Sequence, residues 1–362
     1  MNNEQLTCLI DSLRSGMNDD QAQYLIDEVT EVPEDRNEKL WTKNILDAAI
    51  IIKQHKGAER AITMIKAAYK SWLRDYPTSY SLKTAILKEL CILQILEKKQ
   101  KDAHATMDRY LYNALKQVSA LHHTPRMRYF SFRGFSDYSL KDIEEEQISL
   151  AHPREFNDPL DTILVWWLEN EIKKGELVPD FDFKLLMKKS AEHIKIRCMI
   201  GSKYENEIGD VVERKVEDLS VLMWAHYAKS HTGFCVEYDF EKTDLKTTFS
   251  SDENRLDMIQ AISYVPVITL EEPPSMAKAL FQKSNFWDYE NEMRLCSFDT
   301  MNDNEFPVIK CPGAIKAVYL GAKCNDENRR KMEKAIGNKD IPLYQMSVNE
   351  EKLTRFKKIQ IG

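Results

Sequence analysis

The sequence predicts an α+β protein in two parts, with an all-helical region to about residue 120 and a mixed α+β domain after it. Three observations support this division. From Asn2 to about Val118 apolar residues recur at helical spacing, and a 44-residue repeat relates two hairpins within that region. Alternating stretches typical of half-buried strands begin only beyond it. We therefore expect domains at residues 1–120 and 121–362.

The helical region is expected to form three hairpins. Gly57 marks the turn of the second hairpin, and a shift of 44 residues places Leu46 on Leu90 and Ala61 on Ala105. The two alanines are the small residues at which we expect paired helices to cross. The expected helices are Leu6–Ser15, Asp20–Val29, Leu46–His55, Ala58–Tyr76, Ile86–Lys98 and Asp102–Val118.

This pattern resembles a tetratricopeptide-type array, although the period is longer than in that family and its Trp-Leu-Gly-Tyr signature is missing. Each hairpin of such an array leaves one apolar face uncovered until the next hairpin stacks on it. The resemblance implies a surface that binds a protein partner. The alternative is a rigid structural lid for the second domain.

Charge and composition limit the classes of function. Lys and Arg number 51 against 58 Asp and Glu, and this net charge of −7 gives no indication of nucleic-acid binding. The chain contains no run of the roughly eighteen apolar residues that a membrane span needs, and residues 1–16 lack signal-peptide features. We therefore expect a cytoplasmic protein without membrane contact.

The seven cysteines are scattered and never form a C-x-x-C pair, so they indicate neither a disulfide framework nor a zinc ribbon. We expect free thiols, most of them buried. His226 and His231 are five residues apart, which is not the i, i+4 spacing of a zinc-binding helix. No metal is expected.

Beyond residue 120 strands and helices alternate irregularly, which favours an α+β domain over a doubly wound one. The expected strands are Tyr129–Phe132, Gly233–Phe240, Ser263–Val267, Trp287–Phe298 and Ile315–Leu320. The expected helices are Leu160–Lys174, Phe183–Ile194 and Asn325–Ile336.

The most informative stretch is Trp287–Leu295. On a strand, Glu290, Glu292 and Arg294 would share one face with Asp288, above an apolar underside. Repulsion between neighbouring carboxylates of this kind can raise the pKa of one of them. The two can also bind a polyhydroxylated ligand together. The alternative is an ordinary solvated strand face with Glu292 paired to Arg294.

Two further stretches contain candidate residues. Trp224 and Tyr227 would share one face of a short helix that also carries His226. The alternative is that this helix packs its aromatic face on the core and has no role in binding.

Asn157 lies in the stretch Phe156–Pro159, whose pattern is typical of a helix N-terminus and needs no catalytic role. The sequence contains no phosphate loop and no nucleophile elbow.

Taken together these stretches resemble a bacterial family catalogued as domain of unknown function 2971. The motifs are F-N-D-P, M-W-A-H-Y-A-K-S-H-T-G-F-C-V-E-Y, K-S-N-F-W-D-Y-E-N-E-M-R and Y-L-G, between about Arg128 and Gly321. The helical region lies outside this resemblance, and the family name carries no function.

A second, more distant similarity is to ADP-ribosyltransferase-like domains, whose late strand carries a Glu-x-Glu that Glu290 and Glu292 match. This similarity implies NAD as a substrate. Glu292 would stabilise the positive charge that develops on the ribose, and Glu290 would orient or deprotonate the acceptor. The expected cofactor-binding residues are Arg133, Asn157, Trp224, His226, Tyr227 and Arg294.

The resemblances therefore imply an NAD-consuming effector of a bacterial toxin or phage-defence system, with the helical region selecting a partner. The rival interpretation is a non-catalytic binding module, whose charged residues would lie in open solvent far from Trp224 and the Asn157 turn. A third interpretation, a nuclease, requires carboxylates that hold magnesium. Its candidates are Asp158, Asp161, Glu290 and Glu292.

Overall fold

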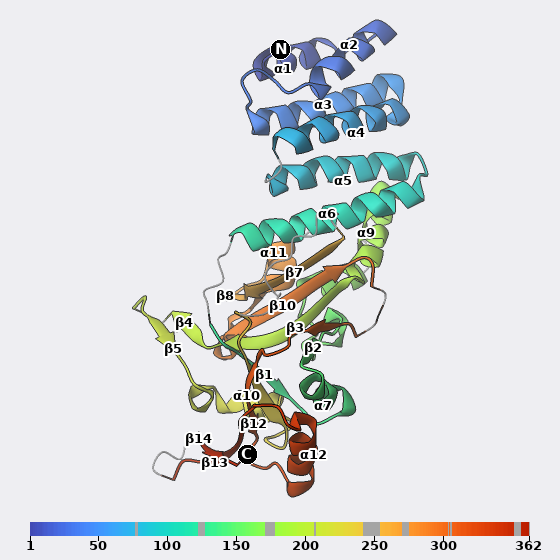
Figure 1. The fold of residues 1–362 in the computed structure, drawn as a ribbon. Helices are drawn as coiled ribbons and strands as arrows, with labels where there is room; N and C mark the ends of the chain where they lie inside the picture. Colours follow the sequence, from blue (N-terminus) through green and yellow to red (C-terminus); the bar gives the residue numbers. More distant parts are fainter. Residues whose placement is uncertain are drawn as a thin grey trace. The chain divides into compact units, whose positions relative to one another are not determined.

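The structure is a computed structural model that describes residues 1–76, 79–121, 127–170, 178–205, 208–241, 254–269, 275–302, 304, 306–350 and 356–361. It divides into two compact units. The helical unit comprises Met1–Leu121 and Trp167–Glu192, and the sheet unit comprises His122–Trp166 and His193–Gly362. The predicted α+β class is confirmed, with helices to about residue 120 and a mixed sheet after them (Figure 1).

The helices of the helical unit stack as successive hairpins, which Figure 1 shows in blue to cyan. Asn2, Asn18 and Asn37 cap three of them by accepting a backbone N–H, and Gly57 turns the chain between two others with φ +88°. The elements are α1 (Asn3–Ser12), α2 (Asp19–Thr30), α3 (Glu38–Lys56), α4 (Ala58–Asp75), α5 (Tyr80–Leu96), α6 (Gln100–Leu121) and α9 (Val178–Ala191).

The expected hairpins are present, but their register differs in one place. Ala61 is buried as predicted, whereas Ala105 is exposed, and Ala103 is the buried small residue of α6. The thiol of Cys91 on α5 lies 3.5 Å from the carbonyl oxygen of Ala103, so this is where the two helices approach. The 44-residue shift is therefore wrong by two residues here, which is about half a helical turn.

Residues 167–192, which the sequence analysis placed in the second domain, belong to the helical unit. Helix α9 packs against α5 and α6, and the rings of Tyr110 and Phe183 meet edge to face with centroids 5.9 Å apart. Sequence periodicity could not reveal this because the segment returns to the helices after an excursion through the sheet unit.

The sheet unit is built on eight strands in the order β14-β13-β12-β6-β1-β3-β10-β7. Only β12 and β13 run parallel, and every other neighbouring pair in this sheet is antiparallel. The strands are β1 (Tyr129–Arg133), β3 (Ile194–Gly201), β6 (Phe234–Tyr238), β7 (Arg255–Ala261), β10 (Glu292–Asp299), β12 (Ile315–Leu320), β13 (Leu343–Val348) and β14 (Phe356–Gln360).

Smaller elements complete the sheet unit. Three two-stranded sheets pair β2 with β11, β4 with β5 and β8 with β9. Their strands are β2 (Gln147–Ser149), β4 (Lys203–Glu205), β5 (Val211–Glu213), β8 (Ser263–Val265), β9 (Gln282–Ser284) and β11 (Val308–Lys310). The helices are α7 (Asp137–Glu144), α10 (Val221–His226), α11 (Met276–Phe281), α12 (Asp326–Ile336), η1 (Pro153–Glu155), η2 (Val216–Asp218) and η3 (Asn285–Glu290). Helix α8 (Ile163–Glu169) begins in the sheet unit, and its residues from Trp167 onward are assigned to the helical unit.

Strand alternation divides the core of the sheet unit between two faces. On β1, Tyr129 packs in a cluster with Leu295 of β10 and with residues of α7 and α12. The next residue, Phe130, points the other way and packs in a second cluster with Trp224 of α10. The candidate site lies on the Phe130 face.

Two sequence predictions about strands were wrong. Ile194 was assigned to the end of a helix, but it begins β3, a central strand paired with β1 and β10. Trp287–Phe298 was assigned to one strand, but Asn285–Glu290 forms the 3₁₀ helix η3 and the strand begins only at Glu292. The cause in the second case is Asn291, whose φ of +48° turns the chain between them.

All seven cysteines are free, and four of them are buried, as predicted: Cys91, Cys235, Cys296 and Cys311. Across the described ranges no helix is both long enough and apolar enough to cross a membrane.

Candidate functional site

A cavity of about 400 Å³ opens on the Phe130 face of the sheet. Side chains of β1 and β3 form its floor, and the turns around η1, α10 and η3 form its walls. The volume is within the ordinary range of small-molecule sites, about 300–1,000 Å³. Its lining includes Phe130, Phe132, Phe156, Asn157, Asp161, Ile196, Cys198, Ile200, Met223, His226, Tyr227, Lys283, Glu290 and Glu292.

The cavity brings together five of the predicted site residues. Glu290 and Glu292 come from η3 and β10, His226 and Tyr227 from the end of α10, and Asn157 from the turn after η1. Asn157 and Glu292 are 135 positions apart in the sequence. The three motifs therefore meet at one cavity, and the charged pair does not lie in open solvent, since Glu290 and Glu292 are 2% and 4% exposed.

The other three predicted residues do not line the cavity. Arg133 follows the alternation of β1 to the opposite face, where its guanidinium donates to Asp142 and Ser149. Trp224 is buried in the core, edge to face against Phe132 with ring centroids 4.9 Å apart. Arg294 is fully buried behind the cavity wall.

The local backbone explains how Glu290 and Glu292 both reach the cavity. Ser284 caps η3 by accepting the N–H of Phe286, and η3 ends at Glu290. Asn291 then adopts a left-handed conformation, which asparagine tolerates better than most residues, and β10 starts at once. The two carboxylates converge because a turn separates them, and not because they alternate along one strand.

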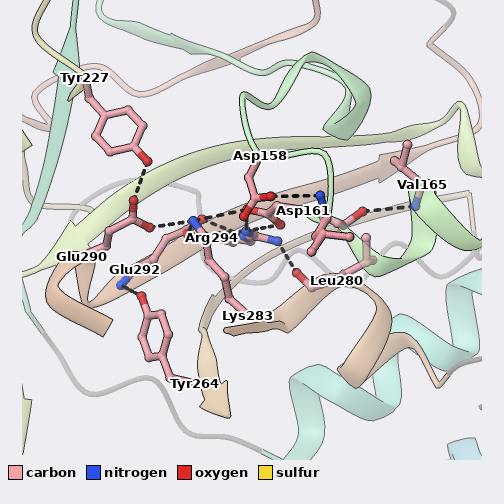
Figure 2. Close-up of polar contacts among 12 residues, drawn as sticks. Asp158, Asp161, Val165, Tyr227, Tyr264, Leu280, Lys283, Glu290, Glu292 and Arg294 are labelled. Carbon is pink, nitrogen blue, oxygen red and sulfur yellow. Dashed lines mark hydrogen bonds and ion pairs between the residues drawn. The ribbon is translucent and has the colours of Figure 1, made fainter. Parts of the chain in front are cut away.

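Arg294 holds the acidic side chains in place. Its Nη2 lies 2.6 Å from both carboxylate oxygens of Asp161, and its Nε lies 2.7 Å from Oε1 of Glu292. Its Nη1 donates to the carbonyl oxygen of Leu280 at 2.6 Å (Figure 2). A fully buried guanidinium is stable only with partners of this kind, because desolvation of an unpaired charge is costly.

Lys283 of β9 links the same carboxylates from another side. Its Nζ is 2.7 Å from Oε2 of Glu290, 3.3 Å from Oε2 of Glu292 and 3.4 Å from Oδ2 of Asp161. It also lies 4.7 Å from the ring centroid of Trp287. One ammonium therefore contacts three buried carboxylates.

Two tyrosines complete the network in Figure 2. The hydroxyl of Tyr227 donates to Oε1 of Glu290, and the hydroxyl of Tyr264 accepts the backbone N–H of Glu292 at 2.8 Å. Burial and the hydrogen bond to Glu290 raise the pKa of Tyr227, so its hydroxyl remains a donor. Tyr227 orients the carboxyl of Glu290 toward the cavity, and Tyr264 fixes the start of β10.

The pKa values of the two glutamates are shifted in opposite directions. Burial raises the pKa of Glu290 above its ordinary value, since Lys283 and Tyr227 offset burial only in part. Burial acts in the same direction on Glu292, but Arg294 and Lys283 outweigh it and lower the pKa to about 2. A pair of carboxyl groups with separated pKa values is what acid–base chemistry requires.

Sequence reasoning missed Lys283, Tyr264 and Cys198 as neighbours of the glutamates, and it considered Asp161 only as a nuclease residue. Cys198 is exposed to the cavity, and burial together with the charge of Glu292 raises its pKa well above the ordinary value. Lys283 is the first residue of the motif K-S-N-F-W-D-Y-E-N-E-M-R, but its position there gave no reason to assign it a role, and no quoted motif contains Tyr264. A signal for Cys198 was the alternation of Ile196, Cys198 and Ile200, in the strand whose first residue, Ile194, was assigned to a helix end.

The carboxylates are already neutralised by side chains of the protein. Asp161, Glu290 and Glu292 share Lys283 and Arg294, and Asp158 uses Oδ1 to accept the N–H of Leu160 at 2.9 Å. Within the described part of the chain, no group of three or more His, Cys, Asp or Glu side chains is arranged to hold a metal ion. The geometry therefore gives no support to the magnesium site of a nuclease.

Part of this site lies within a segment that matches a known family model. Residues 223–295 match the model of the family described as "Protein of unknown function (DUF2971)". The match confirms the resemblance over the segment that carries Tyr227, Lys283, Glu290, Glu292 and Arg294. No curated protein and no solved structure matched the chain.

Proposed function

We propose that the sheet unit is an NAD-consuming, ADP-ribosyltransferase-like enzyme that breaks the bond between nicotinamide and ribose. The observation that carries the proposal is the pair Glu290 and Glu292, which line one aromatic-walled cavity with pKa values shifted in opposite directions. An aromatic wall suits a flat ring, and a fixed carboxylate suits the positive charge of the reacting sugar.

Glu292 has the charge that bond cleavage needs. When the bond breaks, nicotinamide leaves with the electron pair, and the ribose acquires oxocarbenium character. A carboxylate with a pKa of about 2 is ionised at neutral pH, so Glu292 can stabilise that positive charge without first losing a proton. Its position is fixed in advance by Arg294 and Tyr264.

Glu290 suits the second half of the reaction. A nucleophile, either water or an acceptor group, attacks the anomeric carbon and must lose a proton, which Glu290 accepts. A raised pKa makes Glu290 a stronger base than an ordinary carboxylate. The hydroxyl of Tyr227 holds Oε1 in place, and Lys283 lies 2.7 Å from Oε2.

The test is nicotinamide release from NAD by the purified full-length chain, with and without bacterial lysate as a source of acceptors. Glu292→Gln keeps the shape of the side chain and removes its charge, and we expect release to fall at least about a hundredfold. Glu237→Gln is the matched control. Glu237 is equally buried on the same sheet but pairs with Arg128 and Tyr319 and does not line the cavity.

One observation favours the alternative of a non-catalytic binding module. Both oxygens of Glu292 already contact cations, Oε1 with Arg294 and Oε2 with Lys283, so its charge is partly used within the protein. On that interpretation NAD or another ligand binds without turnover. Binding by wild type without nicotinamide release, under all acceptor conditions tried, would favour the module.

We further propose that the helical unit binds a protein partner and that the whole chain acts as a toxin or defence effector. The support is the repeated hairpin architecture together with large apolar side chains that stay exposed on it, at Tyr24, Ile50 and Leu96. Expression of wild type should arrest bacterial growth, and Glu292→Gln should not. A double substitution, Tyr24→Ser with Ile50→Ser, should abolish partner binding without changing NAD turnover.

A further inference from the structure

The central sheet has a gap between two neighbouring strands, β1 and β3. The pairing of these strands ends at Phe130 and Ile200. Farther along β3, the main chain of Ile196 bonds instead to that of Ala151, through hydrogen bonds of 2.8 and 3.0 Å. Strand β1 meanwhile continues along β6, its neighbour on the other side. The two strands therefore separate within the sheet.

Two residues face this gap with their main-chain N–H and C=O groups. In antiparallel sheets, every second residue of a strand points both groups toward the same neighbouring strand. Phe132 lies two residues after Phe130, and Cys198 lies two residues after Ile196, so both point their main-chain groups into the gap. Among the described residues, none bonds to these groups from across the gap.

The gap opens into the cavity. Five consecutive residues of β3, from Ile196 to Ile200, line the cavity. The side chains of Arg197 and Met199 follow the alternation to the opposite face, where Met199 packs in the core and Arg197 donates to Ser149. These two residues therefore border the cavity mainly through main-chain atoms, as an unpaired strand edge does.

The cavity lacks partners for main-chain groups and not for charges. Its three buried carboxylates are each paired with Lys283 or Arg294. Arg197 is a third cation beside them. Main-chain N–H and C=O groups inside proteins, in contrast, are almost always bonded, so an unpaired set within a central sheet points to a missing partner. That partner must present a donor and an acceptor side by side.

We propose that the gap binds an extended peptide segment, which pairs its main chain with Phe132 on one side and with Cys198 on the other. In an extended peptide one residue points its N–H and C=O toward one neighbour, and the next residue points them toward the other. A short segment therefore matches both strand edges, as in other cases of strand addition to a sheet. Phe130, Ile196 and Ile200 provide apolar walls for its side chains.

The peptide lies next to the two glutamates. Glu292 pairs with Ile200 in the register of β10 and β3, and Glu290, Glu292 and Cys198 line the same cavity. This inference rests on the proposed function and names its acceptor, which is a polypeptide. A nucleophilic side chain of the peptide bonds to the anomeric carbon of the ribose, nicotinamide leaves with the electron pair, and the proton of the nucleophile passes to Glu290.

Amide hydrogen exchange of the full-length chain, followed by NMR, tests the gap itself. Each strand supplies its own control, because Ser131 pairs with β6 and Met199 pairs with β10. In the free protein the amides of Phe132 and Cys198 should exchange at least about tenfold faster than those of the two controls, since they lack a main-chain partner. Exchange as slow as in the controls would overturn the inference.

The peptide probe is acetyl-Val-Ser-Val-methylamide, and its control is the same peptide with an N-methyl group on serine. Valine favours an extended main chain, and serine provides a hydroxyl nucleophile. The N-methyl group removes one main-chain donor, so we expect the unmethylated peptide to bind at least about fivefold more tightly. Its binding should slow the exchange of the Phe132 and Cys198 amides and leave those of Ser131 and Met199 unchanged.

Two variants of one residue give a matched pair. The Cys198 side chain is exposed to the cavity, so Cys198→Phe fills the space beside the gap and should abolish peptide binding. Cys198→Ser keeps the size of the side chain and should retain binding. Unfolding curves of the two variants check that each is folded, and the exchange and peptide measurements on wild type stand without them.

Equal binding of the two peptides by wild type, or no binding of either, would also overturn the inference, because main-chain pairing does not depend on one particular sequence. Peptide binding is measured without NAD, and nicotinamide release from NAD is measured separately. Turnover without peptide binding would therefore leave the proposed function standing and remove this inference alone. Peptide binding without turnover would retain the gap as the site of a binding module and remove the enzyme.

Discussion

The ammonium of Lys283 lies 2.7 Å from Oε2 of Glu290, and both side chains are almost fully buried. This pair joins the short strand β9 to the end of η3, and through Glu292 and Asp161 it extends to Arg294. The predictions below test what this network contributes to the fold and to the chemistry of the cavity.

Lys283→Met should destabilise the protein strongly. The variant leaves three buried carboxylates around one guanidinium, and removal of one partner of a buried ion pair costs about 3–5 kcal/mol. Urea unfolding monitored by tryptophan fluorescence measures the loss. Lys310→Met is the control, because Lys310 pairs with Glu145 on the surface, where such a pair contributes about 0–1 kcal/mol. Similar losses in the two variants would contradict a structural role for the buried network.

Glu292 should contribute acid-sensitive stability. Its pKa is lowered from 4.5 to about 2 in the folded protein, so its contribution is present above about pH 4.5 and is lost as the pH falls through 2. A shift of this size corresponds to about 3 kcal/mol. The free energy of unfolding of wild type should therefore fall between pH 4.5 and 2, and Glu292→Gln should show a flatter curve. Parallel curves for the two proteins would contradict the lowered pKa.

Glu290 should have the opposite dependence on pH. Because its pKa is raised on folding, the folded state binds its proton more tightly, and this contribution to stability is lost as the pH rises through the folded pKa. Glu290→Gln should therefore be at least as stable as wild type at pH 8, while Glu292→Gln is less stable. Thermal unfolding at pH 5 and pH 8 gives both comparisons. If Glu290→Gln lowers the free energy of unfolding more at pH 8 than at pH 5, folding lowers the pKa of Glu290, which contradicts the prediction.

Tyr227→Phe tests the hydrogen bond that orients Glu290. The hydroxyl stabilises the carboxylate form, so its removal should raise the pKa of Glu290 further. Carbon-13 NMR of labelled glutamate carboxyl groups measures this pKa directly. In the proposed reaction the same variant should shift the acidic limb of the pH–rate profile to higher pH. An unchanged titration would show that Tyr227 does not control Glu290.

Cys198 provides a chemical probe of the cavity. Its thiol is exposed to the cavity, but its raised pKa keeps it protonated at neutral pH. In a Cys8→Ser background, which removes an exposed thiol of the helical unit, iodoacetamide should label Cys198 slowly at pH 7 and faster as the pH rises. Saturating NAD should slow the labelling. Labelling that is fast at pH 7 would contradict the raised pKa.

Local sequence signals accounted for the elements whose neighbours lie close in the chain. Helical periodicity and the turn at Gly57 predicted the hairpins of the helical unit, and alternation predicted β12 at its observed bounds, Ile315–Leu320. Helical periodicity and strand alternation each depend only on residues of one or two neighbouring elements, so both can be recognised from the local amino-acid sequence. Alternation alone failed at Asn291, because a single left-handed residue ends one element and starts another.

The sequence by itself determined the α+β class and the helical region to about residue 120, and it singled out Glu290 and Glu292 as candidates. Only the tertiary structure decided which residues surround them. Lys283 and Asp161 reach the glutamates from β9 and from the turn before α8, and strand alternation carries Arg133 to the opposite face. The physical reason is that a buried charge is compensated through space, by whichever elements pack around it, and no spacing along the chain records that packing.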